Sequence, residues 1–300
     1  MDSCAVRTAY RSFTVHLAGR LNVGHNKVIC IIILCLANYK DDIERVDYMC
    51  TAVFKNQFLF RTVDRIGSIK EHCIIGRKNY IGGVIQNNYG EIWIDGINKH
   101  GLMTALLNYR KEIANECDGS KNRIKLHWGK FVLYLLENCR DVKDASNAIM
   151  SLHFSSDGPE MYPHFIITDK IGRCIVFESG KVYENTYGVL TNAPSFTEQV
   201  EKLKMCTSDR NDFYSSESRF SRIAQLSKRV KIQSIGDCFD LLTAVTLPEG
   251  ADDRPGYRTI LRSVMSSDSM TYSYAVGGSG KIKTQEFNGN FHIAVNQDEN

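Results

Sequence analysis

The chain has 300 residues, of which 43% are hydrophobic and 24% are charged, a balance typical of soluble globular proteins. Its 37 lysines and arginines against 34 aspartates and glutamates give a formal net charge of +3. The basic residues are scattered and form no stripe interleaved with aromatic residues, which argues against a nucleic-acid-binding protein.

The first 49 residues differ from the rest of the chain. Residues 28–37 form an apolar run that is too short to span a bilayer, for which about 20 residues are needed, so we expect no stable membrane insertion. The run has the length of a signal-peptide core, but cleavage after Ala37 would leave residues 38–49 in front of Cys50. The simplest interpretation is that synthesis begins at Met49. A leader that is removed and an extension that is retained are the alternatives.

From Cys50 to Asn108 the pattern is that of β-strands, because β-branched and aromatic residues are bounded by turn residues. Apolar segments on both sides of residues 55–57 predict a hairpin. Residues 95–98 are Asp-Gly-Ile-Asn, and we interpret them as a turn. The expected strands are 51–54, 58–61, 80–85, 92–94 and 102–107.

Helices and strands then follow in blocks, which fits an α+β fold better than alternating βαβ units. Apolar residues at helical spacing predict the helices, and Asp169 to Gly172 predicts the turn of a hairpin. The chain has no internal repeat and no low-complexity linker, so residues 50–300 are expected to form a single domain. The expected helices are 128–139, 144–152 and about 197–206, 217–229 and 236–246, with strands at 165–167, at 174–177 and in the last 45 or so residues.

The cysteines indicate chemistry at one position only. They form no CxxC pair and no Cys/His cluster with zinc spacing, so neither a metal nor a cofactor is expected. Most of them are interpreted as buried side chains in a reducing compartment, which favours a cytoplasmic protein, with secretion through residues 28–37 as the alternative. Cys50 differs because Met49 precedes it. Removal of that methionine would expose one residue with both a thiol nucleophile and an α-amine whose reference pKa is about 8.

A series of segments occurs in this order along the chain: Met49-Cys50-Thr51, Arg61-Thr62-Val63-Asp64, Asn108, Gly188-Val189-Leu190-Thr191-Asn192-Ala193-Pro194, Ser218-Arg219-Phe220, Tyr257-Arg258-Thr259-Ile260 and Met270-Thr271-Tyr272-Ser273-Tyr274. Together they resemble the choloylglycine hydrolase family, which includes conjugated bile acid hydrolases and penicillin V acylases. The resemblance implies an N-terminal nucleophile hydrolase that cleaves a linear amide bond of a small N-acyl amide. It also implies a four-layer αββα sandwich, with two antiparallel sheets between helical layers.

The resemblance assigns the first catalytic roles to Cys50, Arg61 and Asp64. Cys50 would supply the attacking sulfur, and its own α-amine would act as the base. Asp64 would accept hydrogen bonds from that amine, orient it and stabilise its protonated form. Arg61 would favour the thiolate, since an adjacent cation lowers the pKa of a cysteine.

The remaining catalytic roles fall to Asn108, Asn192 and Arg219. Asn192 would donate its amide N–H to the developing oxyanion, and Asn108 is a second expected donor. Arg219 would support the surroundings of the nucleophile. The histidines match no catalytic position of the family, and we interpret His100, His127 and His164 as structural or surface residues.

The chain departs from the family in two places. Only 21 residues separate Phe196 from Ser218, where many members carry a longer segment that packs subunits into tetramers. This shorter segment argues against a tetramer and leaves open whether the chain forms a smaller homo-oligomer. The residues after Asp64 are less aromatic than in typical bile acid hydrolases, which leaves the acyl group of the substrate open. Asn108 favours bile acid hydrolases weakly, because penicillin V acylases often carry tyrosine there. The alternative function is a catalytically silent protein that binds an acyl ligand while its leader caps Cys50.

Overall fold

The computed structural model describes residues 49–66, 69, 71–87, 90–109, 124–155, 162–192, 195–204, 213–251 and 255–295. The interpretation of residues 1–48 as a leader, with its apolar run at 28–37, lies outside the described residues. Within the described ranges, no helix combines the length and apolar character needed to cross a membrane.

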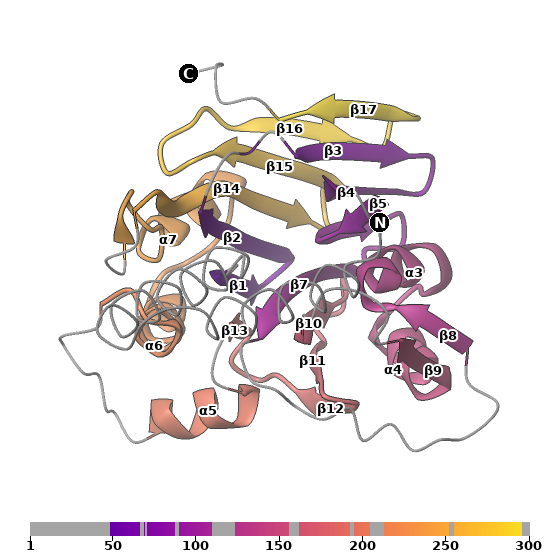
Figure 1. Cartoon of the computed structure of the whole chain (residues 1–300), viewed down its shortest axis with the longest axis horizontal. Coiled ribbons are helices and arrows are strands. Elements are labelled where there is room, and N and C mark those ends of the chain that lie inside the picture. Colours follow the sequence, from indigo (N-terminus) through magenta and orange to yellow (C-terminus); the bar gives the residue numbers. More distant parts are fainter. Residues whose placement is uncertain are drawn as a thin grey trace, which may run out of the picture. The chain divides into compact units, whose positions relative to one another are not determined.

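One antiparallel sheet contains the predicted hairpin that begins at Cys50 (Figure 1). The turn of this hairpin is tight, and Asn56 in the turn has a positive φ of 55°. Asparagine tolerates this conformation better than most residues. The strands in spatial order are β13 (Val189–Thr191), β1 (Met49–Lys55), β2 (Phe58–Ile66), β14 (Tyr257–Ser266), β15 (Thr271–Val276) and β16 (Lys283–Glu286).

The other large sheet is also antiparallel and lies against the first. Contacts of β1 and β2 with β7 join the two sheets. Its strands in spatial order are β12 (Lys181–Glu184), β11 (Cys174–Glu178), β10 (Tyr162–Thr168), β7 (Met103–Tyr109), β6 (Asp95–Asn98), β4 (Tyr80–Asn87), β3 (His72–Arg77) and β17 (Phe291–Ala294), and β5 (Gly90–Trp93) pairs with β4. A separate parallel pair is formed by β8 (Ile124–His127) and β9 (Leu152–Ser155).

Helices cover the outer face of each sheet, which completes the four-layer αββα arrangement. The helices α6 (Ser216–Arg229) and α7 (Ile235–Thr243) pack on the first sheet, and α5 (Phe196–Lys204) contacts α6. The helix α3 (Phe131–Asn138), preceded by the 3-10 turn η1 (Trp128–Lys130), and the helix α4 (Val142–Ser151) pack on the second. Serine caps explain where two of these helices begin: the side chains of Ser215 and Ser234 accept hydrogen bonds from the first turns of α6 and α7.

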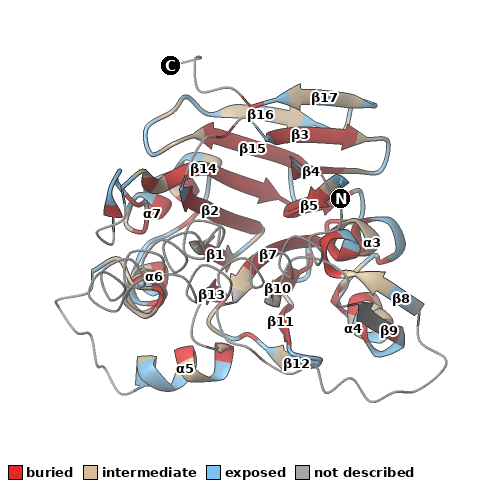
Figure 2. Cartoon of the chain, in the orientation of Figure 1, coloured by how far each residue is buried: buried red, intermediate tan, exposed pale blue. Residues whose placement is uncertain are grey.

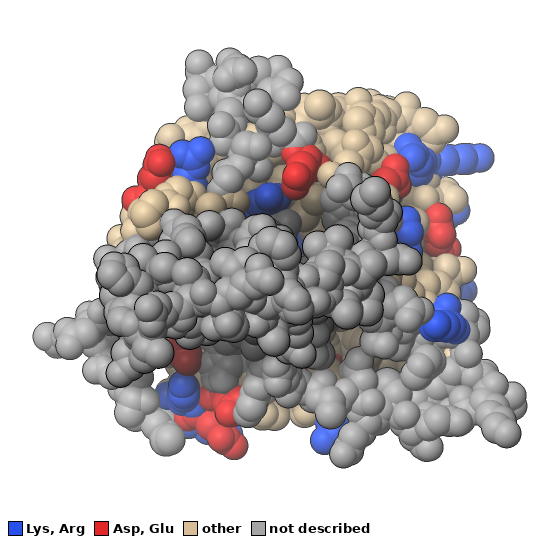
Figure 3. Space-filling view, viewed as in Figure 1, with Lys and Arg blue, Asp and Glu red and all other residues tan. Residues whose placement is uncertain are grey.

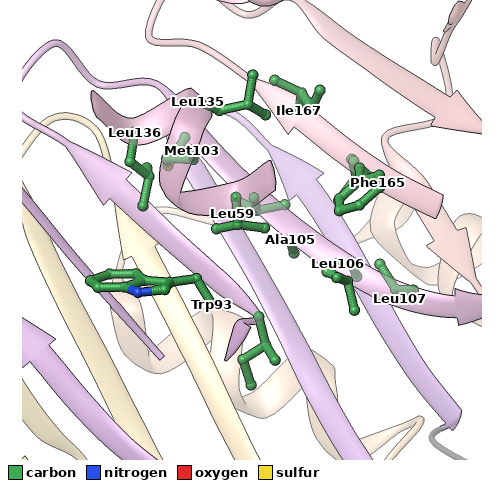
Figure 4. Close-up of a cluster of buried hydrophobic side chains, with 14 of the residues drawn as sticks. Leu59, Trp93, Met103, Ala105, Leu106, Leu107, Leu135, Leu136, Phe165 and Ile167 are labelled. Atoms are coloured by element: carbon green, nitrogen blue, oxygen red, sulfur yellow. The ribbon is translucent and has the colours of Figure 1, made fainter. Parts of the chain in front are cut away.

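Apolar side chains fill the spaces between the layers. Figure 4 shows Leu59 of β2 near residues of β7, with α3 and β10 beyond them. On the helical side of the second sheet, the rings of Phe131 and Phe165 meet edge to face with centroids 4.6 Å apart. Figure 2 shows that the strands are buried along the centre of both sheets, while exposed residues lie on the outer sides of the helices. On the face in Figure 3, described basic and acidic side chains are interspersed.

The expected turn at residues 95–98 is wrong, because these residues form β6 at the centre of the second sheet. Asp-Gly is a turn signal locally, but here Gly96 allows two layers to approach closely. A Cβ atom at this position would lie 2.6 Å from Leu136 Cδ1 of α3 and 2.8 Å from the Ile81 carbonyl oxygen. The expected strands also left out β3, β8, β9, β12 and β13. The other predicted strands and helices are confirmed, with ends shifted by a few residues.

Candidate active site

Cys50 lies on β1, where the alternation of a strand directs neighbouring side chains to opposite faces. Cys50 and Ala52 belong to the apolar core shared with the second sheet, whereas Val53 packs against the α6 and α7 layer. Cys50 is only 2% exposed. In the hairpin register Cys50 pairs with Val63, so the end of β2 lies beside the nucleophile.

The charge of Arg61 acts on the Cys50 thiol. Burial raises the pKa of this thiol, while the Arg61 guanidinium opposes that rise and Asp64 adds to it. Burial also raises the pKa of Cys73 to about 11 and of Cys139 to about 12, and the described side chains whose charges act on these two thiols are acidic. Cys50 therefore differs from these thiols in having a cation that favours its thiolate.

Arg61 is itself held by buried partners on the second sheet. Its Nη1 atom donates to the Ile94 carbonyl oxygen at 2.7 Å and lies 3.7 Å from Asp95 Oδ2. Asp95 accepts further hydrogen bonds from the hydroxyls of Tyr272 at 2.7 Å and Ser263 at 2.9 Å. A fixed anion with its own donors thus anchors the guanidinium beside the thiol.

Asp64 is completely buried and accepts hydrogen bonds on both carboxylate oxygens. Thr259 donates to Oδ1 at 2.6 Å, while Thr62 at 3.1 Å and Arg219 at 2.9 Å donate to Oδ2. Burial raises the pKa of the Asp64 carboxyl from 3.8 to about 6, although Arg219 and the two threonines oppose the rise. The carboxylate therefore changes charge close to neutral pH.

Arg219 is fully buried on α6 and connects that helix to the hairpin. Its Nη1 atom donates both to Asp64 Oδ2 and to Thr51 Oγ1, the latter at 2.8 Å. Its Nε atom donates to the Tyr214 carbonyl oxygen at 3.2 Å. The structure thus places Arg219 next to the residue that follows the nucleophile and next to Asp64.

Asn192 connects the nucleophile to the second sheet. Its Oδ1 atom accepts a hydrogen bond from the backbone N–H of Cys50, and its Nδ2 atom donates to the Asn108 carbonyl oxygen at 2.5 Å. The side-chain oxygen of Asn108 is buried and has no hydrogen-bond partner in the described part of the chain. All the residues to which the resemblance assigned a role therefore meet around Cys50. The carboxamide N–H of Asn192, expected to face an oxyanion, points here to Asn108.

His127 and His164, which we interpreted as structural or surface residues, contact residues outside the group around Cys50. His127 Nδ1 accepts from the Gly129 N–H at the start of η1, and His164 Nδ1 lies 2.8 Å from Glu178 Oε2, with both of these side chains buried. No group of three or more histidine, cysteine, aspartate or glutamate side chains within the described ranges is arranged to hold a metal ion.

Sequence reasoning missed three residues that support the site. Thr62 shares a strand face with Asp64, which a strict alternation of side chains along β2 would have indicated. Asp95 has apolar neighbours in the sequence, which is a signal for a buried carboxylate. We interpreted it as part of a turn because the dipeptide Asp-Gly is typical of turns. Thr259 lies in a segment that carried the resemblance, but nothing local connects it with Asp64, 195 residues away.

Comparison with known sequences places this site in context. Residues 46–221 match the family described as linear amide C-N hydrolases, choloylglycine hydrolase family. An uncharacterized protein of Paramecium bursaria Chlorella virus 1 is 28% identical over 194 residues, which cover 52% of this chain and 68% of that protein. A bile salt hydrolase/transferase of Lactiplantibacillus plantarum is 26% identical over 244 residues, which cover 66% of this chain and 74% of that protein.

Solved structures share the fold. A mutant conjugated bile acid hydrolase from Clostridium perfringens superposes with a TM-score of 0.69 and 19% identity, covering 84% of this chain and 97% of that one. A penicillin V acylase from Agrobacterium tumefaciens gives a TM-score of 0.64 at 18% identity, covering 79% and 86%. The α+β fold of this chain, with its two antiparallel sheets, therefore matches that of these N-terminal nucleophile hydrolases.

Proposed function

Because this chain belongs to the choloylglycine hydrolase family of linear amide C-N hydrolases, we propose that it hydrolyses a small N-acyl amide with the Cys50 thiol as nucleophile. The observation that carries the proposal is the position of Cys50. Its side chain is buried beside the Arg61 guanidinium, and its nitrogen is bonded to Asn192. A buried inert cysteine would need neither of these polar partners.

The first half of the proposed reaction forms a thioester. The α-amine of Cys50 takes the proton from the thiol, and the sulfur attacks the carbonyl carbon of the amide. The carbonyl oxygen becomes an oxyanion, for which we expect two donors: the Asn108 amide and the second N–H of the Asn192 carboxamide, whose first N–H is bonded to Asn108. The C–N bond then breaks, its electrons stay on the leaving nitrogen, and the proton held by the α-amine moves to that nitrogen.

The second half releases the acyl group. Water gives a proton to the α-amine and attacks the thioester carbonyl carbon, and the same donors stabilise the second oxyanion. The C–S bond breaks, the sulfur recovers its proton from the α-amine, and a carboxylic acid leaves. Asp64 would stabilise the positive charge that the amine carries between the two proton transfers.

The mechanism needs an uncapped nitrogen on Cys50. In the described chain Met49 is joined to Cys50, so this nitrogen belongs to a peptide bond and has no available lone pair. Met49 pairs with Asp64 in the hairpin register, so removal of Met49 would leave the new amine beside the end of β2 that carries Asp64. Synthesis from Met49 with methionine removal and cleavage of a longer leader both remain routes to this state.

The names of similar proteins support a substrate class for this proposal. Proteins similar to this chain are named bile salt hydrolase/transferase and penicillin V acylase, and both names describe N-acyl amide chemistry. We propose a linear N-acyl amide that releases glycine, taurine or a β-lactam nucleus, with Asn108 favouring conjugated bile acids. We place the enzyme in the cytoplasm, because the described cysteines are free and buried, as suits a reducing compartment.

N-terminal sequencing of the active protein, together with assays of Cys50→Ser and Cys50→Ala, tests this proposal. Glycine- and taurine-conjugated bile acids and penicillin V serve as substrates. We expect active protein to begin at Cys50 and the alanine variant to release no product. Turnover by Cys50→Ala, or activity in protein that begins at another residue, would overturn the mechanism.

A binding protein is the second candidate, favoured by one observation. With Met49 attached, β1 is a regular strand and the Cys50 N–H is satisfied by Asn192, so the capped chain has a complete local structure. Such a protein would hold an acyl ligand without cleaving it. Residues 1–49 found on the stable protein, with no labelling of Cys50 by iodoacetamide, would favour this candidate over the hydrolase.

A further inference from the structure

The side chain of Gln199, on α5, is bonded to the backbone of Thr191 from both ends of its carboxamide. Its Oε1 atom accepts from the Thr191 N–H at 3.1 Å and from the Thr191 hydroxyl at 3.1 Å. Its Nε2 atom donates to the Thr191 carbonyl oxygen at 2.8 Å. Because β13 is the edge strand of its sheet, Gln199 here satisfies backbone groups that a further strand would otherwise pair.

The position of Gln199 is unusual for a polar side chain. The helix α5 is largely exposed, and its only buried residues are Phe196 and Gln199, the latter 1% exposed. Burial of an amide costs free energy unless its hydrogen bonds are made. The buried position of Gln199 is therefore explained by its hydrogen bonds to Thr191 of β13.

Thr191 directly precedes Asn192, so its backbone sets where the Asn192 carboxamide lies. That carboxamide accepts from the Cys50 N–H and donates to the Asn108 carbonyl oxygen. Thr191 is also close to α6, because the Ser216 carbonyl oxygen lies 3.0 Å from the Thr191 hydroxyl and is a second acceptor for its one proton. A shift of the Thr191 backbone would therefore move the group that contacts the nucleophilic residue.

We propose that Gln199 is a positioning residue for amide hydrolysis, which acts through the Thr191 backbone to hold Asn192 against Cys50. The inference rests on the proposed function. It assigns a role to the helix α5. Displacement of a reacting group by about 1 Å can lower the rate about 10²-fold, so a loose Asn192 would affect turnover much more than substrate binding.

Two substitutions separate the hydrogen bonds from the volume of the side chain. Gln199→Met keeps the length and loses every hydrogen bond to Thr191. Gln199→Glu keeps the acceptor, and a buried carboxyl there would gain a donor for the Thr191 carbonyl when it is protonated. Ser195→Ala is the control, because among the described residues the Ser195 hydroxyl bonds to Thr197 and Glu198 in the first turn of α5 and not to Thr191. It should weaken the same helix without touching Thr191.

The measurements are kcat, KM and Tm for each variant with the substrate that the wild-type enzyme cleaves. We expect Gln199→Met to lower kcat by about 10- to 100-fold with KM changed less than about twofold. Ser195→Ala should lower Tm while keeping kcat within about twofold. The rate of Gln199→Glu relative to wild type should rise as the pH falls from about 8 to about 6, since protonation restores the donor.

Four results would count against the proposal, and they can be told apart. An unchanged kcat in folded Gln199→Met would overturn the role of Gln199 and leave the hydrolase proposal standing. If Gln199→Met and Ser195→Ala both lost kcat in proportion to their decrease in Tm, Gln199 would be a structural residue and not a positioning residue. The same conclusion would follow if the rate of Gln199→Glu relative to wild type did not vary with pH. A wild-type chain beginning at Cys50 that cleaves no N-acyl amide would overturn both proposals together.

Discussion

The guanidinium of Arg219 donates a hydrogen bond to the carboxylate of Asp64 across 2.9 Å, and both side chains are completely buried. The two residues are 155 positions apart, on α6 and on β2. Burial of one charge without the other is costly, so each residue requires the other. Because Asp64 pairs with Met49 in the register of the hairpin, this ion pair also orders the backbone at the position where the amine of Cys50 would form.

Arg219→Met should therefore destabilise the protein strongly. The substitution leaves the Asp64 carboxylate buried without its cation, and loss of one partner of a buried pair costs about 3 to 5 kcal/mol. Urea denaturation would measure the change in the free energy of unfolding. Lys202→Met is the control, because Lys202 and Glu217 form a 2.9 Å ion pair that is exposed and worth about 0 to 1 kcal/mol. Similar losses in both variants would contradict the assignment.

Activity should fall below about pH 6, where the Asp64 carboxyl becomes protonated. A neutral Asp64 no longer balances Arg219 and no longer stabilises a protonated amine on Cys50. The measurement is kcat/KM between about pH 4.5 and pH 8, which reports groups of the free enzyme.

Folding stability should respond to this group in the opposite direction. The pKa of Asp64 is raised from 3.8 to about 6, so the folded state holds the proton more tightly than the unfolded chain. Its stabilising contribution is therefore fully present below the unfolded pKa and is lost as the pH rises through about 6. An activity loss on acidification that coincides with unfolding would contradict the role given to Asp64.

Thr259→Val should move the acidic limb of the activity profile to higher pH. The Thr259 hydroxyl donates to Asp64 Oδ1 at 2.6 Å, and this bond lowers the pKa of the carboxyl. Its loss raises that pKa further, and stability should fall by about 1 to 3 kcal/mol because a buried acceptor loses its donor. Thr246→Val is the control, since in the described part of the chain the Thr246 hydroxyl donates to the Leu242 carbonyl oxygen, four residues earlier, and not to Asp64. A limb that stays in place would show that Asp64 does not govern it.

Arg61→Met should make Cys50 less reactive. The guanidinium lowers the pKa of the thiol, so its removal leaves burial unopposed and reduces the thiolate fraction. The rate of Cys50 alkylation by iodoacetamide at about pH 7, followed by mass spectrometry, should fall about tenfold for each unit by which the pKa rises. Arg65→Met, on the same strand and paired with Glu71, should leave the rate unchanged. Equal rates in all three proteins would exclude an effect of Arg61 on the thiol.

Part of the site can be predicted from local sequence patterns. The two apolar segments around residues 55–57 predict the hairpin, and its two-residue turn sets the register that brings Cys50 opposite Val63. Alternation along β2 then places Thr62 and Asp64 on one face. The same kind of local reasoning failed at residues 95–98, because the dipeptide Asp-Gly by itself favours a turn. In the folded chain, pairing with β4 and β7 and hydrogen bonds from Tyr272 and Ser263 outweigh that preference.

By itself the sequence determined the α+β class, the order of most strands and helices, and the residue types that a thiol-based amide hydrolase requires. Tertiary structure alone decided that Asp64 is shared by Arg219 and Thr259, that Asp95 anchors Arg61, and that Gln199 holds the backbone before Asn192. The physical reason is distance along the chain. Strand alternation and helix periodicity depend on neighbouring residues, whereas buried polar groups find partners only after sheets and helices have packed and excluded water.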